Sequence, residues 1–303
     1  MKIYVIGVGG VGGYFGGLLA KAGMDITFVA RSGQDQAMQK YGLIVKSAAG
    51  DFMINPVRVI DDISKMSSPN LVLVCVKTYD TATVAKQLAG VVSRSLVITF
   101  QNGVENDLEI KKYLPSALVF PGVAYVISRK TKPGVIEQTG GLRKLIFGDR
   151  NGTYQEELRE IESFMKKTGI NAELSQDITI ELWQKFVFII PFSGLTTCYR
   201  KSIGEILMNV NTKQEYEQSL REVITVAHAC GVQLPNNTFE STMTLSQKTA
   251  PNSKSSLLVD IESGYKTELE TLHGALVRLA KEKGIPVPKN EQIYHAIRSV
   301  SRA

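Results

Sequence analysis

Residues 2–13 read KIYVIGVGGVGG, a short apolar strand that runs directly into a glycine-rich turn. Gly7, Gly9 and Gly12 follow the pattern G-x-G-x-x-G. The first glycine permits a tight turn, the second lets a ligand approach the backbone, and the third lets the next helix pack against the strand. A helix over 11–22 and a strand over 26–30 complete a βαβ unit. The pattern predicts that the turn and the N-terminal end of the helix bind a pyrophosphate.

Two other interpretations of this segment were weighed against dinucleotide binding. A signal peptide needs an apolar helix, which glycine disfavours, and seven glycines lie between Gly7 and Gly17. A glycine-rich turn without a ligand is the second alternative, and the complete βαβ unit counts against it. We therefore predict contacts to a dinucleotide cofactor from Gly7, Val8, Gly9, Gly10, Val11 and Gly12.

The end of the second strand indicates which dinucleotide binds. Folds that prefer NAD place an acidic residue about 20 residues after the glycines, where it binds the ribose 2′-OH. Here the strand continues into Arg31, and no acidic residue stands beside it. A guanidinium can hold a 2′-phosphate through charge-assisted hydrogen bonds, so Arg31 favours NADPH. A surface arginine in a loop is the alternative.

The amino-acid composition limits the classes of protein to which this chain could belong. The chain has 303 residues, enough for two domains, and 44% of them are hydrophobic. Its net charge of +6 comes from scattered lysines and arginines without a basic run, so we expect anionic small molecules rather than nucleic acid as partners. The apolar run 186–192 is too short for a membrane span. Three cysteines without metal or redox spacing predict a cytoplasmic protein and no metal site.

Strands and helices alternate in the first half, which predicts an α/β fold with a doubly wound parallel sheet. A change to helices after Gln176 predicts a cofactor-binding domain over 1–174 and an all-helical domain over 175–303, with the ligand site between them. The expected strands cover 2–6, 26–30, 43–47, 71–76, 96–101, 117–128 and 170–174, a hairpin covers 134–139 and 144–148, and the expected helices cover 11–22, 33–40, 79–90, 104–113 and 154–168.

Several residues in these elements could carry chemistry. Lys77 and Asn102 follow two parallel strands, whose ends face the cofactor in such sheets, although a solvated strand end and a turn explain them equally well. Lys185 precedes five apolar residues on an expected helix, and burial would lower its pKa enough for proton donation near neutrality. A lysine extending from the core edge to solvent is the alternative. For Glu268, and for Ser255 and Ser256, helix capping is the alternative to a site role.

The helical half also has expected helix boundaries. Ser202-x-x-Glu205 and Thr267-x-x-Glu270 both fit a capping box, in which a hydroxyl and a carboxylate cap the first turn. Gly231 and Gly284 stand where helices should stop.

At these residues the chain resembles the ketopantoate reductase family. Residues 181–185 read ELWQK and resemble the family's E-L-W-x-K segment, and residues 255–274 resemble its S-x-x-x-D…G-x-x-T-E-[IL]-[DE]…G signature. Residues 285–290, the glycine turn, Arg31, Lys77 and residues 101–103 also match, so the resemblance is collinear over nearly the whole chain.

The resemblance implies a Rossmann domain, a helical domain and NADPH-dependent reduction of a 2-oxo acid. It implies that Lys185 is the general acid, that Glu268 and Ser256 hold the substrate's hydroxyl and carboxylate, and that Lys77 and Asn102 line the site from the cofactor side. Asn102 would contact both cofactor and substrate. One departure concerns the substrate: many family members carry asparagines one and two helical turns after the lysine, where this chain has Ile189 and Ser193.

The leading hypothesis is therefore reduction of 2-dehydropantoate (ketopantoate) to pantoate for coenzyme A biosynthesis. A reductase of another branched 2-oxo acid and an NADPH-binding sensor without turnover are the alternatives; Lys185 and Glu268 count against the sensor. The sequence does not define an oligomeric state, and a homodimer stays open.

Overall fold

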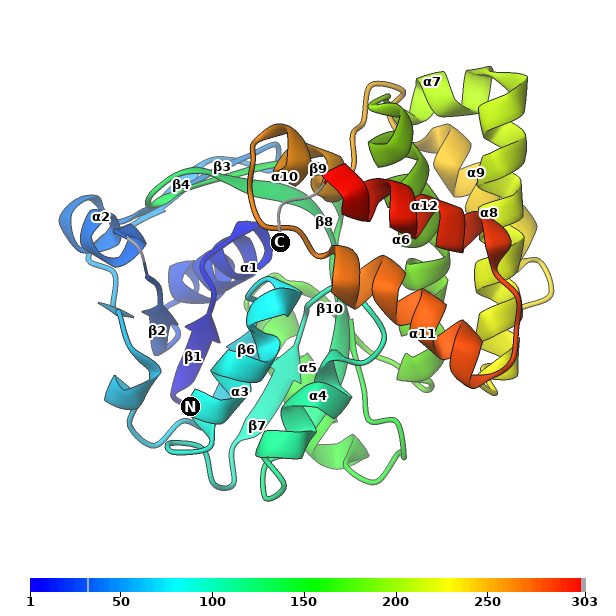
Figure 1. Cartoon of the computed structure of the whole chain (residues 1–303). Coiled ribbons are helices and arrows are strands. Elements are labelled where there is room, and N and C mark those ends of the chain that lie inside the picture. The colour runs from blue at the N-terminus through cyan, green and yellow to red at the C-terminus, as the bar shows by residue number, and fades with distance from the viewer. Residues whose placement is uncertain (32, 301–303) are drawn as a thin grey trace. The chain divides into compact units, whose positions relative to one another are not determined.

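The computed structural model describes residues 1–31 and 33–300. The chain folds into two compact units, Met1–Ile178 and Thr179–Ala303. In the described residues, the first unit contains ten strands that form one sheet. Figure 1 shows how the labelled strands are arranged. The strands are β1 (Ile3–Ile6), β2 (Ile26–Val29), β3 (Leu43–Ser47), β4 (Phe52–Ile54), β5 (Val59–Ile60), β6 (Leu71–Val74), β7 (Leu96–Thr99), β8 (Leu118–Lys132), β9 (Val135–Phe147) and β10 (Asn171–Leu174).

Parallel pairs predominate in this sheet, as the βαβ pattern predicts. The strand order is β4-β3-β9-β8-β7-β6-β1-β2-β5, and β10 lies beside β9. All neighbours from β8 to β5 run parallel, whereas β8 with β9 and β3 with β4 are antiparallel. The C-terminal ends of β1, β6 and β7 therefore lie along one edge, which is where doubly wound sheets bind ligands.

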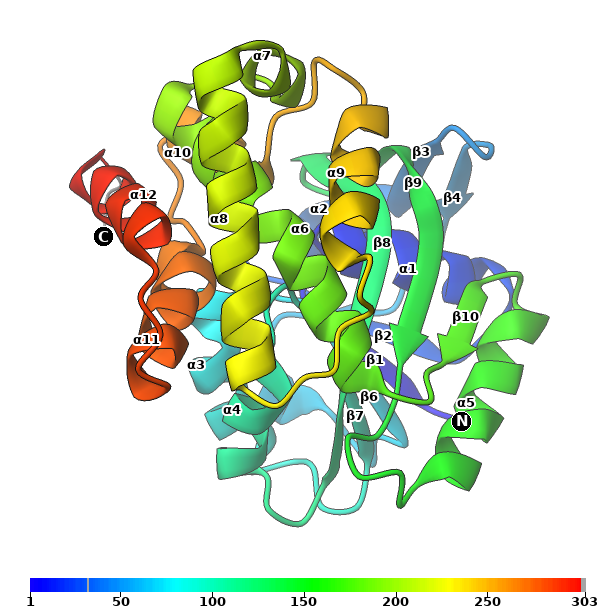
Figure 2. The same cartoon turned by 90° about the vertical axis from the view of Figure 1, so that its right-hand side faces the viewer.

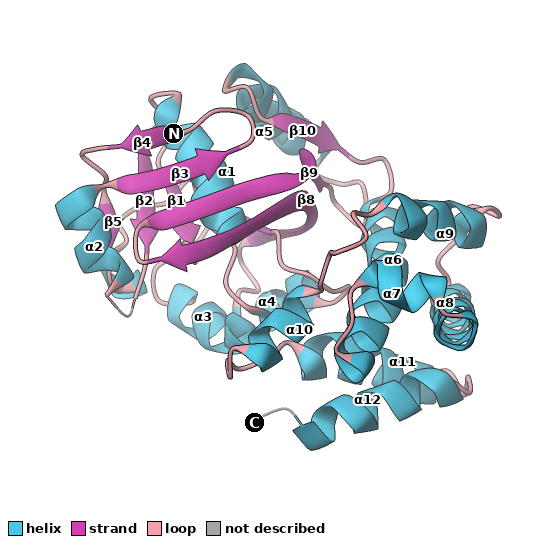
Figure 3. Cartoon of the chain, turned by 90° about the horizontal axis from the view of Figure 1, so that it is seen from above, coloured by secondary structure: helices cyan, strands magenta, loops and turns pink. Residues whose placement is uncertain are grey.

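Helices cover both faces of the sheet because side chains alternate along its strands (Figure 3). Ile3 and Val5 of β1 belong to one core, together with residues of α1 (Gly10–Lys21), α2 (Gln34–Tyr41) and α5 (Gln155–Lys167). Tyr4 and Ile6 belong to a second core, together with residues of α3 (Thr81–Leu88) and α4 (Asn106–Tyr113). This two-faced burial confirms the doubly wound prediction.

The expected hairpin over 134–148 is wrong. These residues form the single strand β9, which pairs along its length with β8. Gly141 has φ +82°, but the register shift between Tyr125 and Ile127 on β8 accommodates it without reversing the chain. The short strands β4 and β5 were also not predicted, because three and two residues are too few to show a period.

The second unit consists of helices and their connections in the described part of the chain (Figure 2). Its elements are α6 (Ile178–Tyr199), α7 (Ile203–Met208), α8 (Val210–Ala229), α9 (Thr238–Lys248), α10 (Ser256–Glu262), the π-helical turn η3 (Glu270–Gly274), α11 (Ala275–Glu282) and α12 (Pro288–Val300). An all-helical second half was the prediction.

Three of the predicted helix boundaries are confirmed. Ser202 and Glu205 form the capping box at the start of α7. Gly231 and Gly284 follow the ends of α8 and α11 with φ angles of +84° and +67°, a conformation that glycine adopts without strain.

Helix α6 is long and apolar enough to cross a membrane by length and composition. However, 56% of its most apolar window is buried inside the protein, as in the core helix of a globular domain. A single helix of this kind is weak evidence for a membrane span.

Candidate functional site

The turn after β1 is shaped by glycines that no other residue can replace. Gly7 has φ +94°, and a Cβ built on it would lie 2.7 Å from the backbone nitrogen of Val76. A Cβ on Gly12 would lie 2.2 Å from the carbonyl oxygen of Gly7. Both distances are far below a van der Waals contact, so these two glycines are required for the chain to turn and for α1 to pack against the sheet.

Gly9 differs from these two glycines, because its lack of a side chain points to a bound ligand. Its backbone is extended, with φ −88° and ψ −158°, a conformation open to any residue, and a Cβ built on it meets no atom within 4 Å. The fold itself therefore does not demand glycine here. Gly9 lies immediately before α1, whose N-terminal N–H groups favour an anion. A pyrophosphate fits this cradle.

The remaining residues of the turn have structural partners as well. A Cβ on Gly10 would lie 2.2 Å from the carbonyl oxygen of Ser128 on β8, so close packing already requires that glycine. The carbonyl of Val8 accepts a hydrogen bond of 2.9 Å from Nε2 of the buried Gln34. Val11 packs against the core that contains α1. Their predicted contacts to the cofactor stay predictions.

Arg31 stands two residues after the end of β2 and is exposed. Its Nη2 group donates a hydrogen bond to Oε1 of Gln87 on α3. The strand next to β2 is β5, and the carboxylate of Asp62, two residues beyond β5, lies near enough for Arg31 to affect it electrostatically. The sequence showed no acidic residue beside Arg31, but the fold brings one into its neighbourhood.

Lys77 and Asn102 lie at the ends of adjacent strands, as predicted. Lys77 is half-buried beyond β6, and its carbonyl accepts a hydrogen bond from the backbone of Asp80. Asn102 is half-buried beyond β7, and its carbonyl accepts a hydrogen bond of 2.8 Å from the Asn106 side chain. Since β6 lies between β1 and β7, the structure brings both residues to the sheet edge that carries the glycine turn.

The buried Gln101 joins these strand ends. Its Nε2 donates to the carbonyl of Val76 at 3.0 Å and to Oγ1 of Thr81 at 2.8 Å, and its Oε1 accepts from Oγ1 of Thr99 at 2.8 Å. These bonds hold the segments before Lys77 and Asn102 together. Sequence reasoning missed this role, because Gln101 and Thr81 are 20 residues apart and their contact exists only in the folded chain.

In the second unit, Glu268 lies near enough to Lys185 to act on it electrostatically. Burial lowers the pKa of the Lys185 ammonium on α6 to about 8, while the negative charge of Glu268 acts in the opposite direction. Glu268 is itself buried, with 7% of its surface exposed. The ammonium is therefore charged at neutral pH but closer to losing its proton than an ordinary lysine, which is the property of a general acid.

The segment that carries Glu268 differs from the predicted helix start. The helix winds as a π-helix over η3, and the backbone carbonyl of Glu268 accepts hydrogen bonds from the Leu272 backbone and the Thr271 hydroxyl, each at 3.1 Å. The predicted capping box is absent, because the Glu270 carboxylate accepts bonds from the hydroxyl of Tyr294 instead. Single π-turns are frequent at functional sites.

The two serines near α10 have different surroundings. Ser255 is buried, caps α10 by accepting a bond from the Leu258 backbone, and accepts another from Oγ1 of Thr196 at 2.8 Å. Capping was the alternative that the sequence left open for it. Ser256, predicted to hold substrate, is the first residue of α10 and is exposed.

The two positions that depart from the resemblance lie on the same helix as Lys185. Ile189 is half-buried and apolar. Oγ of Ser193 is 2.9 Å from Nε2 of His273, and both residues are buried. Burial lowers the pKa of His273 to about 4, so the ring is neutral at pH 7. The Ser193 hydroxyl is thus engaged within the protein.

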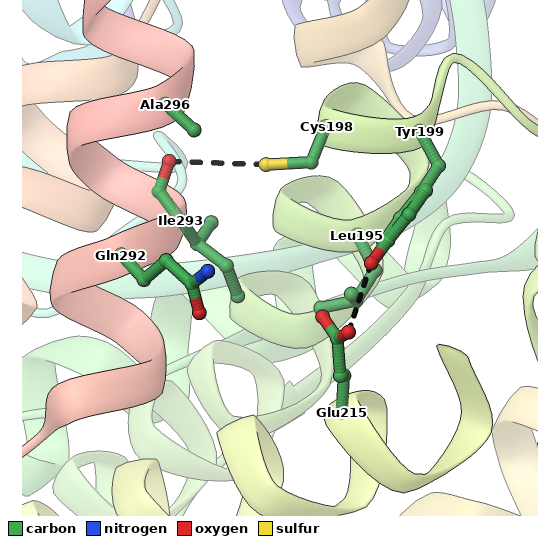
Figure 4. A pocket seen from close by; sticks show the side chains of 7 residues that line it. All are labelled: Leu195, Cys198, Tyr199, Glu215, Gln292, Ile293 and Ala296. Atoms are coloured by element: carbon green, nitrogen blue, oxygen red, sulfur yellow. Dashed lines mark hydrogen bonds between the residues drawn. The ribbon is translucent and has the colours of Figure 1, made fainter. Parts of the chain in front are cut away.

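A separate pocket of about 180 Å³ lies between α6, α8 and α12 (Figure 4). Two hydrogen bonds join residues of its wall: Cys198 Sγ donates to the carbonyl of Ile293, and the hydroxyl of Tyr199 donates to Glu215 at 2.9 Å. Burial raises the pKa of the Cys198 thiol to about 11, so it is protonated at neutral pH. None of the predicted site residues lines this pocket. Within residues 1–31 and 33–300, no cluster of histidine, cysteine and acidic residues could hold a metal.

Comparison with known proteins matches both units. Residues 3–152 match the family described as ketopantoate reductase PanE/ApbA, and residues 177–301 match its C-terminal domain. The chain belongs to the ketopantoate reductase family. This ketopantoate reductase family protein is accordingly an oxidoreductase, with the Rossmann and helical architecture that the resemblance implied.

Relatives align along the full chain. An uncharacterized oxidoreductase of Bacillus subtilis is 29% identical and a 2-dehydropantoate 2-reductase of Nostoc is 28% identical; the alignments cover 97% and 98% of this chain and 97% and 94% of those proteins. The crystal structure of a ketopantoate reductase family protein from Ralstonia eutropha is 28% identical, with a TM-score of 0.91 over 99% of this chain and 98% of the other. A D-mandelate dehydrogenase with NADH and anilino(oxo)acetate shares the fold, with a TM-score of 0.90 at 17% identity over 99% and 98% of the two chains.

Proposed function

We propose that this family member reduces 2-dehydropantoate to pantoate with NADPH, in the cytoplasm, as a step of pantothenate and coenzyme A biosynthesis. The observation that supports the reductase reaction is the half-buried Lys185, whose pKa is lowered to about 8, with the buried Glu268 acting on it electrostatically. It supplies a proton donor poised near neutrality beside a carboxylate. Family membership and a relative named 2-dehydropantoate 2-reductase support the choice of substrate.

The residues of the first unit fit a dinucleotide. The cradle at Gly9 and the N-terminus of α1 suit the pyrophosphate, and Arg31 suits a 2′-phosphate. Lys77 and Asn102 stand at the same sheet edge and would line the site from the cofactor side. When bound, the reduced nicotinamide supplies a hydride to the carbonyl carbon of the substrate.

The helical unit would supply the proton that the reduction requires. As the carbonyl carbon accepts hydride, negative charge develops on its oxygen. Lys185 stabilises this charge and transfers a proton from Nζ to the oxygen, which completes the 2-hydroxy acid. The carboxylate of Glu268 keeps Lys185 protonated and orients the substrate hydroxyl. Ser256, exposed at the N-terminus of α10, would bind the substrate carboxylate.

A second candidate substrate is another branched 2-oxo acid. The observation that favours it is the surface of α6 beyond Lys185. Ile189 cannot form a hydrogen bond through its side chain, and the Ser193 hydroxyl already contacts His273. A substrate hydroxyl would therefore find fewer polar partners here than the two asparagines of many relatives would provide.

One assay tests the reaction and separates the two substrates. The oxidation of NADPH is followed with 2-dehydropantoate and with 3,3-dimethyl-2-oxobutanoate, which lacks only the hydroxyl group. A higher kcat/KM for 2-dehydropantoate supports the first substrate, and a higher value for its deoxy analogue supports the second. A protein that binds NADPH but oxidises it with neither acid, nor with a wider panel of 2-oxo acids, would be a sensor.

A homodimer is part of the same proposal and is tested by light scattering of the purified protein.

A further inference from the structure

Arg31 is held by a side chain that the sequence analysis did not connect with it. Its Nη2 group donates a hydrogen bond to Oε1 of Gln87, 56 residues further along the chain. Both side chains are exposed. An exposed arginine normally samples many rotamers, and it loses that freedom when it binds a ligand. The hydrogen bond to Gln87 restricts Arg31 before any ligand arrives.

The hydrogen bond to Gln87 leaves the positive charge of Arg31 in place, and the Asp62 carboxylate is the acidic group that Arg31 affects electrostatically. Gln87 is a neutral acceptor, so it orients the guanidinium without neutralising it. The nearby carboxylate of Asp62 accepts a hydrogen bond from the backbone N–H of Ser64, and this bond lowers the pKa of Asp62 most. Arg31 lowers the same pKa from a greater distance. Among the residues that the structure describes, no carboxylate lies within 4 Å of the Arg31 guanidinium.

The helix that carries Gln87 is anchored in the core of the first unit. Gln87 stands in the last turn of α3, whose residues Val84, Ala85 and Leu88 are almost completely buried in the core on that face of the sheet. A guanidinium has five N–H donors in a fixed plane, so one bond to Gln87 leaves four for another acceptor. The helix can therefore fix the direction in which the remaining donors point.

We propose that Gln87 is a positioning residue that holds Arg31 ready for the 2′-phosphate of NADPH, and that it thereby sets the preference for NADPH over NADH. This inference rests on the proposed role of Arg31. NADH has a hydroxyl where NADPH has the phosphate, so NADH gains little from an oriented guanidinium.

The test measures dissociation constants for NADPH and NADH by titration calorimetry. Gln87→Leu should weaken NADPH about 3- to 10-fold, the effect of losing one solvent-exposed hydrogen bond of ordinary net strength, and should leave NADH unchanged. Gln87→Glu should weaken NADPH further, because the new carboxylate neutralises Arg31 and repels the phosphate. The matched control is Gln39→Leu, another exposed glutamine, on α2, which should change neither constant.

Two further variants separate this inference from the proposal on which it rests. Arg31→Ala should weaken NADPH alone, and adding Gln87→Leu to Arg31→Ala should have no further effect. If Arg31→Ala weakens NADPH selectively but Gln87→Leu binds as the wild type does, the role of Gln87 is refuted and that of Arg31 stands. Equal loss of both cofactors in Gln87→Leu also refutes it. If Arg31→Ala changes neither cofactor, the 2′-phosphate assignment itself fails.

Discussion

Replacing Lys185 with alanine removes the proposed proton donor while leaving the first unit intact. Positioned acids typically contribute about 10²- to 10⁴-fold, so kcat should fall by that factor, and NADPH should still bind. Lys185→Arg should restore little, because arginine keeps the charge but does not give up a proton at any relevant pH. Lys248→Ala, which removes an exposed lysine of α9, is the control and should leave kcat unchanged.

The pKa of Lys185 also predicts how kcat should depend on pH. With a value of about 8, roughly nine-tenths of the enzyme carries the proton at pH 7 and roughly one-tenth at pH 9. The acid form is needed, so kcat should fall about tenfold per pH unit above 8. Because Glu268 raises the pKa of Lys185, Glu268→Gln should move this alkaline limb to lower pH.

The assay is steady-state kcat from pH 6 to pH 10 with the better of the two substrates. A Lys185→Ala variant within about twofold of the wild type would refute proton donation by this lysine, since even the lower end of the range is about 100-fold. A wild-type rate that stays level up to pH 10 would show that the ammonium is not desolvated as the structure indicates. A Glu268→Gln limb that moves to higher pH would contradict the pairing.

Three further predictions concern binding and stability. Gly9→Val should leave the melting temperature unchanged but abolish NADPH binding, because a Cβ at Gly9 meets no protein atom within 4 Å. Gly12→Val should prevent folding, because a Cβ there would lie 2.2 Å from a carbonyl oxygen. A folded Gly9→Val protein that binds NADPH tightly would count against the phosphate cradle. Arg150→Met should cost about 3–5 kcal/mol in urea unfolding, because the Asp107 carboxylate, 6% exposed, loses its bidentate partner; a change under about 1 kcal/mol would contradict this. Folding lowers the pKa of His273 from 6.5 to about 4, so the free energy of unfolding should fall by about 3 kcal/mol as the pH falls from 6.5 to 4 and should not depend on this ring above pH 6.5. His273→Leu should reduce this loss of stability in acid. Equal acid sensitivity in both proteins would speak against the buried ring as its cause.

Local patterns predicted the parts of the fold that local chemistry determines. The glycine turn, the alternation of strands and helices, the capping box at Ser202 and the glycines that end α8 and α11 all follow from backbone conformations that few residues can adopt. The single strand β9 was not predicted, since Gly140 and Gly141 are typical of a turn. What keeps the chain extended there is pairing with β8, a contact that no window of sequence contains.

The same distinction applies to the candidate site. Lys185 stood out because a charged residue beside five apolar ones is unusual, and the ends of β6 and β7 follow from the order of elements. The contacts that tune these residues join positions far apart in the chain: Ser193 with His273, Gln101 with Thr81, and Arg31 with Gln87. Glutamine and serine are common residues without a period or motif, so only their placement in three dimensions reveals these roles.

The cysteines bear on how the protein tolerates oxidants. Burial raises the pKa of Cys75 to about 12 and that of Cys198 to about 11, so at neutral pH the thiolate, which is the form that peroxide and alkylating reagents attack, is roughly one part in ten thousand or less. Cys75 follows β6, two residues before Lys77. At neutral pH both thiols are therefore protonated, and the half-buried Cys75 is also less accessible to such reagents than the exposed Cys198.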